Sequence, residues 1–343
     1  MPLPEPNRQP IHNAAGVSDV LLSVRNLSVD YFQPEGRVSA ARKVSLTIGR
    51  GRTVALLGES GSGKTTVALS IMRLIPPTQG KILTGSIVFD GIDLPSLSVR
   101  QLREIRGNKI AMVFQELATS LNPVLTVGAQ IAEAIAAHRR MSRSQAWSNA
   151  VELLGSVGLA DAAGWAKRYP HEFSSGMQQR AMIAMALACN PQLLIADEPT
   201  ASLDVITQAH VLDLLQRHQW RTGMSILLIT HDLSVAARYA HDVAVMYASK
   251  IVETGVARDF FKGPLHPYSQ LLLKSVPSRG HSVGELPTIS GDAPEPLRFP
   301  AGCEFHPRCA VGCSDINCRT VEPELRAAGP GRRVACRHVP GFA

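Results

Sequence analysis

The chain has 343 residues with an ordinary composition, 45% hydrophobic and 18% charged, which predicts about two soluble folded domains. No run approaches the roughly 18 to 20 consecutive apolar residues of a membrane-spanning helix, and residues 1–19, rich in proline and polar side chains, lack the apolar core of a signal peptide. The formal net charge of +7 is scattered, so a basic surface near anionic lipid explains it as well as a nucleic-acid site does. We expect residues 1–19 to be a disordered tail and the protein to stay in the cytosol.

The first predicted elements are antiparallel strands. Alternating segments at residues 22–31 and 43–48 are separated by turn-forming residues at 33–36. Further along the chain, apolar runs alternate with helical stretches, which is typical of a parallel sheet covered by helices. The predicted strands of this sheet are residues 54–57, 110–114, 193–196 and 226–230.

A phosphate-binding motif follows the first of these parallel strands and precedes a helical stretch at residues 66–74. It reads Gly58-Glu59-Ser60-Gly61-Ser62-Gly63-Lys64-Thr65. Glycines let such a loop form a concave nest of N–H groups, and the following helix adds its positive N-terminal end. Lys64 can then reach the β- and γ-phosphates of a nucleotide, and the Thr65 hydroxyl can bind Mg²⁺. The expected nucleotide contacts are Gly58, Ser60, Gly61, Ser62, Gly63, Lys64, Thr65 and Thr66.

Helical periodicity dominates the middle of the chain. The best candidates are residues 127–138, 145–157 and 177–188, with no strand pattern between them. We therefore expect an inserted helical subdomain at about residues 116–190. No internal repeat is present, which leaves one nucleotide domain in the chain.

Two acids, Asp197 and Glu198, end the strand at residues 193–196. Ligands bind at the carboxyl ends of parallel strands, so Asp197 is placed to hold Mg²⁺ and Glu198 to polarise the water that attacks the γ-phosphate. Taken alone, two acids after a strand are equally typical of a solvated turn; the phosphate-binding motif favours the catalytic interpretation.

Three further residues end strands near the predicted site. His231 could hydrogen-bond the γ-phosphate or orient the water, and Gln115 could contact both Mg²⁺ and the attacking water. The ring of Tyr31 could stack on adenine, although an ordinary sheet aromatic explains its position nearly as well.

In this order, the motifs of residues 20–255 resemble those of the nucleotide-binding subunit of ABC transporters. Residues 173–180 stand where that family carries its signature, residues 201–204 match the loop after the catalytic glutamate, and His231 matches the switch histidine. The resemblance implies an α/β fold of the P-loop NTPase class, an ABC-type nucleotide-binding domain with an antiparallel β subdomain. It also implies an ATPase in which two subunits sandwich two ATP molecules.

The resemblance assigns Ser174, Gly176 and Asp204 to nucleotide binding across the dimer. Ser175 departs from the family pattern because it replaces the first of two signature glycines. Serine fits there without strain if the residue has a negative φ, and is strained if φ is positive.

Three stretches narrow the resemblance to importers of oligopeptides and dipeptides: residues 114–123 look like their glutamine loop, residues 266–272 like their His-Pro-Tyr motif, and residues 302–309 like the Cys-x5-Cys of their C-terminal extension. We therefore expect an extension at residues 256–343. The implied location is peripheral, on the cytoplasmic face of the membrane.

The implied partners are two transmembrane permeases, a second ATP-binding subunit, and an extracellular or periplasmic solute-binding protein acting through the permeases. Family precedent favours a paralogue over a second copy as the ATP-binding partner, and no nucleic acid is expected. An importer of nickel or another small solute, or a non-transport ABC ATPase, are the alternatives.

Five of the six cysteines lie after residue 302. Such a cluster in a cytosolic protein favours a metal site over disulfides, whereas Cys189 lies in an apolar helical stretch and is typical of a core residue. The resemblance implies a four-iron cluster, 4Fe–4S, with Cys313 as the alternative third ligand. Zinc is the alternative metal, although the short Cys-x2-Cys turns of many zinc sites are absent, and a structural role without metal stands behind both. The expected ligands are Cys303, Cys309, Cys318 and Cys336.

Overall fold

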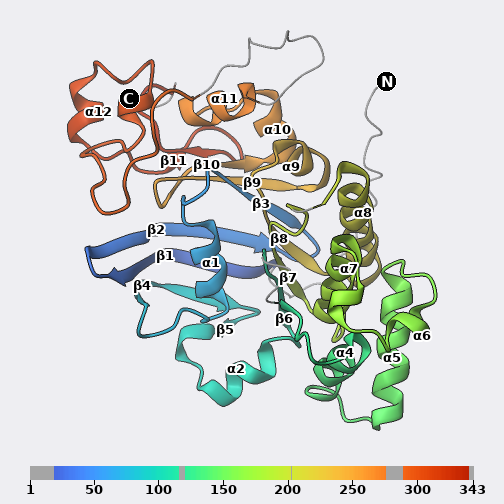
Figure 1. Cartoon of the computed structure of the whole chain (residues 1–343). Helices are drawn as coiled ribbons and strands as arrows, with labels where there is room; N and C mark the ends of the chain where they lie inside the picture. Colours follow the sequence, from blue (N-terminus) through green and yellow to red (C-terminus); the bar gives the residue numbers. More distant parts are fainter. Residues whose placement is uncertain (1–18, 116–119, 202, 276–288, 340–343) are drawn as a thin grey trace.

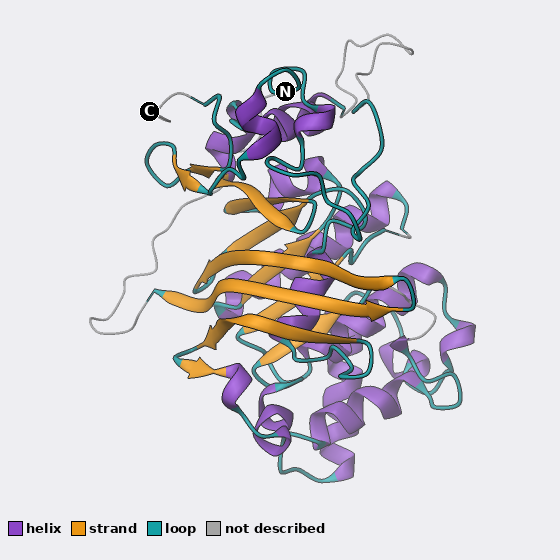
Figure 2. Cartoon of the chain, turned by 90° about the vertical axis from the view of Figure 1, so that its left-hand side faces the viewer, coloured by secondary structure: helices purple, strands orange, loops and turns teal. Residues whose placement is uncertain are grey.

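The computed structural model describes residues 19–115, 120–201, 203–275 and 289–339. The predicted tail therefore lies outside these ranges except for Asp19, as do residues 116–119 of the predicted glutamine loop and Ser202. Within them, an antiparallel sheet, at the left in Figure 1 and in front in Figure 2, lies beside a larger mixed sheet, and helices surround the larger sheet. This arrangement confirms the predicted α/β class.

The antiparallel sheet has the strand order β2-β1-β4-β5. Its first hairpin is the predicted one, with Gln33 paired to Gly36 across a two-residue turn. The two central strands bury a row of apolar side chains against the second sheet, which explains their alternating pattern. The bounds are β1 Val20–Gln33, β2 Gly36–Gly49, β4 Gly80–Phe89 and β5 Ile92–Asp93.

The larger sheet has the order β11-β12-β10-β9-β3-β8-β7-β6. The four predicted parallel strands are its adjacent members β6, β7, β8 and β3, and three of them are buried at every residue, which accounts for their continuous apolar runs. The bounds are β3 Thr53–Leu57, β6 Ile110–Val113, β7 Leu193–Asp197, β8 Ser225–Ile229, β9 Asp242–Tyr247, β10 Lys250–Val256, β11 Arg326–Ala327 and β12 Arg333–Val334.

The predicted helical subdomain corresponds to helices α4 to α7, which lie together at one end of the molecule (Figure 1). Helix α4 begins at the predicted residue, whereas α5 and α7 each begin two residues before the predicted position; at α5, Ser142 forms a capping box with Gln145. The bounds are α4 Val127–Ala136, α5 Arg143–Ser156, α6 Ala162–Trp165, η2 Pro170–Glu172 and α7 Ser175–Leu187.

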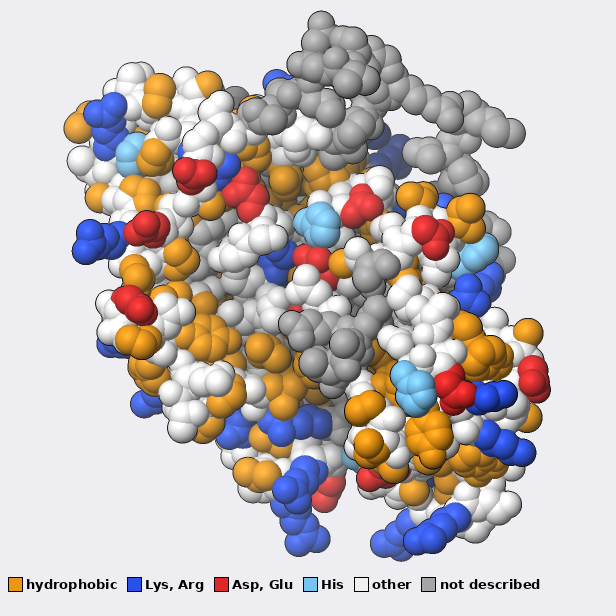
Figure 3. Space-filling model, viewed as in Figure 1, with side chains coloured by type: hydrophobic (Ala, Val, Ile, Leu, Met, Phe, Trp, Pro, Cys, Tyr) orange, Lys and Arg blue, Asp and Glu red, His pale blue; other side chains and the backbone are white. Residues whose placement is uncertain are grey.

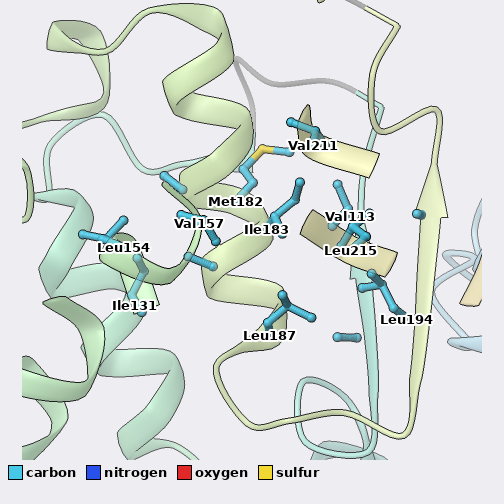
Figure 4. Packing of buried hydrophobic residues seen from close by; sticks show 14 of the residues in the cluster. Val113, Ile131, Leu154, Val157, Met182, Ile183, Leu187, Leu194, Val211 and Leu215 are labelled. Atoms are coloured by element: carbon cyan, nitrogen blue, oxygen red, sulfur yellow. The ribbon is translucent and has the colours of Figure 1, made fainter. Parts of the chain in front are cut away.

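One apolar core joins this subdomain to the sheet. Figure 4 shows Ile183 and Leu187 of α7 directed toward Val113 of β6, Leu194 of β7 and Leu215 of α8. The core fixes α7 against the strands that carry the candidate catalytic residues. The other helices are α1 Lys64–Ile71, η1 Leu94–Ser96, α2 Val99–Ile105, α8 Val205–Thr222 and α9 Leu233–Tyr239.

The predicted extension lies at the opposite end of the molecule, beside β10 (Figure 1). Its strand β12 pairs with β10, and the buried carboxylate of Glu253 accepts hydrogen bonds from the N–H groups of Leu265 and His266 and from Arg332. The extension is therefore joined to the core sheet. Its helices are α10 Ala257–Lys262, α11 Pro267–Lys274, η3 His306–Arg308 and α12 Ile316–Thr320.

Two further features are the apolar character of the helices and the distribution of charged side chains on the surface. Among the described residues, no helix combines the length and apolar character needed to cross a membrane. On the face shown in Figure 3, Lys and Arg side chains lie at several separate places with Asp and Glu side chains between them.

Candidate functional site

The phosphate loop, residues 58–65, connects β3 to α1 and is held tightly between neighbouring strands. Gly58 has φ 149° and Gly63 has φ 100°, backbone conformations that residues other than glycine rarely adopt. A Cβ atom would lie 2.2 Å from the carbonyl oxygen of Met246 at Gly58, and 2.1 Å from that of Ala40 at Gly63. Only glycine therefore allows the loop this close approach to β9 and β2.

Lys64 lies at the first position of α1, so Thr65 and Thr66 lie in the first turn, where the backbone N–H groups have no partner within the helix. The ammonium group of Lys64 donates to the carbonyl oxygens of Gly58 at 2.8 Å and Glu59 at 2.9 Å. Burial lowers its pKa, and the carboxylates of Glu198, Asp197 and Glu59 act in the opposite direction. The loop thus already holds the Lys64 ammonium group, which can donate hydrogen bonds to a phosphate group.

Asp197 is 2% exposed at the end of β7, and its Oδ1 atom has no hydrogen-bond partner. Burial raises the pKa of this carboxyl group, and a hydrogen bond with the Thr65 side chain opposes the rise. A buried carboxylate oxygen without a partner is costly unless a cation compensates it. A carboxylate beside a hydroxyl is an oxygen donor set that suits Mg²⁺, so the residues present fit the expected ion.

Glu198 follows β7, and its side chain contacts residues that follow the neighbouring strands β6 and β8. Its Oε2 atom accepts a hydrogen bond from Gln115 at 3.3 Å, and its Oε1 atom lies 3.2 Å from Nδ1 of His231. The residue has φ 46°, and its N–H donates to the carbonyl oxygen of Ile229 at 2.9 Å. Such a conformation is strained for a residue with a side chain, and strain of this kind clusters at functional sites. The structure therefore brings the three predicted catalytic side chains together.

Two residues predicted to bind nucleotide across the dimer, Ser174 of the signature and Asp204 of the loop after the catalytic glutamate, lie at the starts of two adjacent helices. Ser174 caps α7 by accepting the N–H of Met177, and Asp204 caps α8 by accepting those of two following residues. A Cβ atom at Gly176 would lie 3.1 Å from the methyl group of Thr207, which shows how close the two helices are. Helix α7 begins at Ser175, earlier than the expected start near Met177.

The backbone of Ser175 and the packing of Tyr31 bear on the roles predicted for these two residues. Ser175 is helical and is not among the described residues with positive φ, so serine fits there without backbone strain. Tyr31 is half-buried in β1, and its ring lies against Gly80 of β4. That packing is what an ordinary sheet aromatic would show, and it leaves adenine stacking as a prediction.

A second candidate site, here called the cysteine pocket, is lined by four cysteines of the extension. They are Cys303, Cys309, Cys318 and Cys336. Burial raises the pKa of the Cys303 thiol to about 12 and that of Cys318 to about 11. The fifth cysteine, Cys313, is exposed and does not line the pocket. Thiolates in such a buried place need a positive partner, so the four cysteines that line the pocket, Cys318 among them, fit a bound metal.

The spacing of the ligand atoms bears on which metal fits. A zinc ion with four thiolates brings the sulfurs to about 3.8 Å from one another, given a Zn–S distance of about 2.3 Å. Among the described residues, the group of three potential ligands whose atoms lie within 4.8 Å of one another is Asp315, Cys318 and His338. This group offers oxygen, sulfur and nitrogen donors of the kinds that bind zinc, which is the alternative to a cluster on the four cysteines.

The structure shows a contact between the extension and the phosphate loop that the sequence does not predict. Arg308 donates to both carboxylate oxygens of Glu59, at 2.9 and 3.1 Å, and Tyr268 accepts the N–H of Glu59 at 3.0 Å. Glu59 occupies one of the four unspecified positions of the phosphate-binding pattern, and Arg308 follows it by 249 residues. No sequence signal connects the two.

Comparisons with known proteins agree with this geometry. The family described as ABC transporter matches residues 41–201, and the family described as the C-terminal region of oligopeptide/dipeptide transporters matches residues 252–315. The chain is 46% identical over 316 residues to the oligopeptide transport ATP-binding protein AppD of Bacillus subtilis, covering 92% of this chain and 96% of AppD. It is 44% identical to the oligopeptide transport ATP-binding protein OppD of Salmonella typhimurium, covering 93% of this chain and 94% of OppD.

Solved structures with the same fold include nucleotide-binding proteins. The dimeric post-hydrolysis state of the ATP-binding cassette MJ0796, bound to ADP and Pi, matches with a TM-score of 0.63 at 30% identity, covering 69% of this chain and 99% of that one. The structure of cbiO1 from Clostridium perfringens, part of the ABC transporter complex cbiONQ, matches with a TM-score of 0.60 at 27% identity, covering 71% and 92%.

Proposed function

The chain belongs to the ABC transporter family, as an ATP-hydrolysing subunit of the oligopeptide and dipeptide type, and we propose on this premise that it drives peptide import. The observation that supports ATP hydrolysis, the energy source in this proposal, is the contact of Glu198 with both Gln115 and His231, beside a complete phosphate loop. In our proposal Glu198 polarises the attacking water, His231 orients it and holds the γ-phosphate, and Gln115 contacts both water and metal.

The proposed nucleotide contacts come from two subunits. In this chain the loop N–H groups and Lys64 bind the phosphates, Thr65, Gln115 and Asp197 hold Mg²⁺, and Tyr31 stacks on adenine. When bound, Mg²⁺ neutralises charge on the β- and γ-phosphates. The exposed starts of α7 and α8, with Ser174, suit a γ-phosphate that arrives from the partner's loop, because helix N-termini attract anions. We propose a paralogous subunit as that partner.

The proposed location is peripheral, on the cytoplasmic face of the membrane, where the subunit binds two permeases that work with an external solute-binding protein. The substrate assignment is supported by the names of the similar proteins AppD and OppD, which are oligopeptide transport proteins. Importers of nickel or other small solutes, and non-transport ATPases, remain the alternatives to be tested.

Deletion of the gene should abolish uptake of radiolabelled di- or oligopeptides by intact cells, and the wild-type chain should restore it. The Lys64→Ala variant should not restore uptake, because the phosphates lose their closest counter-ion. Nickel uptake, measured in the same cells, should be unchanged. Loss of nickel uptake alone would move the assignment to the metal importers, and unchanged uptake of both would contradict a transport role.

The loop that follows β6 should contact a permease, because ATP-driven closure must move the membrane subunits. Val124 is 74% exposed in this loop, just before α4. A photo-reactive amino acid at Val124 should cross-link to a permease in intact membranes. Trp220 on α8 is 67% exposed and gives a matched control that should not cross-link to it. Products with soluble proteins only, or equal yields from both positions, would contradict the coupling role.

We propose that the cysteine pocket holds a four-iron cluster with a structural role. The support is the shared pocket of the four thiols and the N–H of Gly312, which donates to the sulfur of Cys309 at 3.2 Å, a contact typical of cluster sulfurs. The extension offers little apolar material for a core of its own, so a bound cluster would stabilise its loops. Zinc is the alternative.

A further inference from the structure

Glu59 is the point at which the extension meets the nucleotide site. Its carbonyl oxygen accepts hydrogen bonds from Lys64 and from the N–H of Ser62 at 3.2 Å, so it belongs to the internal framework of the phosphate loop. Its own N–H and its carboxylate are both bonded to residues beyond position 256, namely Tyr268 and Arg308. Glu59 thus forms hydrogen bonds both within the phosphate loop and with the extension.

Arg308 is fixed before it reaches Glu59. Its side chain is 7% exposed, its Nε donates to the carbonyl oxygen of Ser290 at 3.2 Å, and its guanidinium lies 5.8 Å from the centroid of the Tyr247 ring. The two-pronged bond to Glu59 therefore forms between prearranged groups, which is the geometry in which an arginine–carboxylate pair is strongest. A rigid guanidinium in this place holds the Glu59 side chain in one orientation.

Tyr268 is equally well fixed on α11. It is fully buried, and its ring packs against Tyr247 at 4.6 Å and Phe305 at 5.4 Å between centroids. The hydroxyl group therefore cannot follow a displaced loop, and it defines where the N–H of Glu59 must lie. Arg308 and Tyr268 together hold both the backbone and the side chain of Glu59.

The charge of Glu59 explains why this support affects ATP. A carboxylate inside a phosphate-binding loop repels the incoming phosphates unless a cation compensates it. Lys64 is bonded to the carbonyl oxygens of Gly58 and Glu59, whereas Arg308 is the cation hydrogen-bonded to the Glu59 carboxylate. Without Arg308, the Glu59 side chain would lose this support and leave a negative charge uncompensated beside the incoming phosphates.

We infer that Arg308 and Tyr268 are positioning residues for nucleotide binding, through which the extension sets the affinity of the phosphate loop for ATP. The inference rests on the proposed ATPase function. Neither residue touches the groups around Glu198 in the contacts described, so their effect should appear in ATP binding more than in the rate of the chemical step.

The test is the dissociation constant of MgATP for the full-length chain, together with KM and kcat for ATP in the assembled transporter. Arg308→Ala should weaken binding and raise KM by about tenfold with kcat changed little, because it removes a charged hydrogen-bonded pair. Arg308→Lys, which keeps the charge, should recover part of the affinity. Tyr268→Phe, which keeps the ring, should weaken binding to a smaller extent.

Two further variants separate positioning from general damage to the extension. Glu59→Gln combined with Arg308→Ala should bind ATP more tightly than Arg308→Ala alone, since it removes the uncompensated charge. Arg332→Ala breaks an ion pair with Glu253 in the same extension, away from the phosphate loop, and should leave the ATP affinity unchanged.

Unchanged affinity in Arg308→Ala, an equal loss in Arg332→Ala, or no recovery in the double variant would overturn the inference. If Arg308→Ala does not fold, Arg308→Lys and Tyr268→Phe still decide it, because wild-type ATP affinity in both variants would overturn the inference. Failure of the wild-type chain to bind or hydrolyse ATP would instead reject the proposed function, so the two failures are distinguishable.

Discussion

Glu198→Gln should reduce ATP turnover of the assembled transporter by roughly 10²- to 10⁴-fold, the usual contribution of a positioned general base. The amide has the size of the carboxylate and can still contact Gln115 and His231, so the strained turn after β7 should persist. It cannot take a proton from the attacking water, which is the property that the reaction needs. ATP binding should therefore survive and the ATP-bound closed dimer should accumulate, measured by nucleotide retention.

Lys64→Ala gives the contrasting result, because it acts on binding rather than on the chemical step. Loss of a charged hydrogen-bond donor to the phosphates should weaken ATP binding by roughly ten- to hundredfold.

The matched control for Glu198→Gln is Glu172→Gln, which makes the same chemical change on the surface of the helical subdomain. Its ATP turnover should stay near that of the wild type. Normal turnover in Glu198→Gln would contradict the role assigned to Glu198.

The nucleotide site could be predicted from sequence because its residues follow strands with strong local patterns. Thr53–Leu57, Leu193–Asp197 and Ser225–Ile229 are continuous buried runs, and parallel strands bring their carboxyl ends to one edge of the sheet. The proximity of Glu198 and His231 follows from that rule alone. Their distances and the positive φ of Glu198 do not, since they depend on packing that no local pattern encodes.

The extension shows where local patterns fail. Strands β11 and β12 have two residues each, too few to show any period; β12 forms by pairing with the edge that β10 offers, and β11 pairs with β12. The start of α7 differs for a related reason: Ser174 caps the helix with its side chain, whereas the hydrophobic pattern predicts a start at residue 177, two residues after the observed one. Contacts between distant segments, such as Arg308 with Glu59, require the tertiary structure.

Anaerobically purified protein should be brown and contain about four irons per chain, as four cysteine ligands imply. Cys303→Ser should remove the iron, because Cys303 is one of the four thiols of the pocket, and it should loosen the residues beyond His266. Iron analysis, visible absorption and hydrogen exchange of the extension measure these outcomes. The loss should be close to complete, since a cluster with three thiolates and a weaker hydroxyl ligand is poorly held.

Cys313→Ser is the matched control because it makes the same chemical change at an exposed cysteine of the same extension. It should keep the colour and the iron, whereas iron loss in this variant would make Cys313 a ligand in place of Cys318. Colourless anaerobic protein with stoichiometric zinc would replace the iron assignment, and Asp315→Ala and His338→Ala should then reduce zinc, because these side chains converge on Cys318. Protein without any metal would reject the site, since burial raises the pKa of the Cys303, Cys318 and Cys336 thiols and a bound metal is the positive partner that would hold them as thiolates.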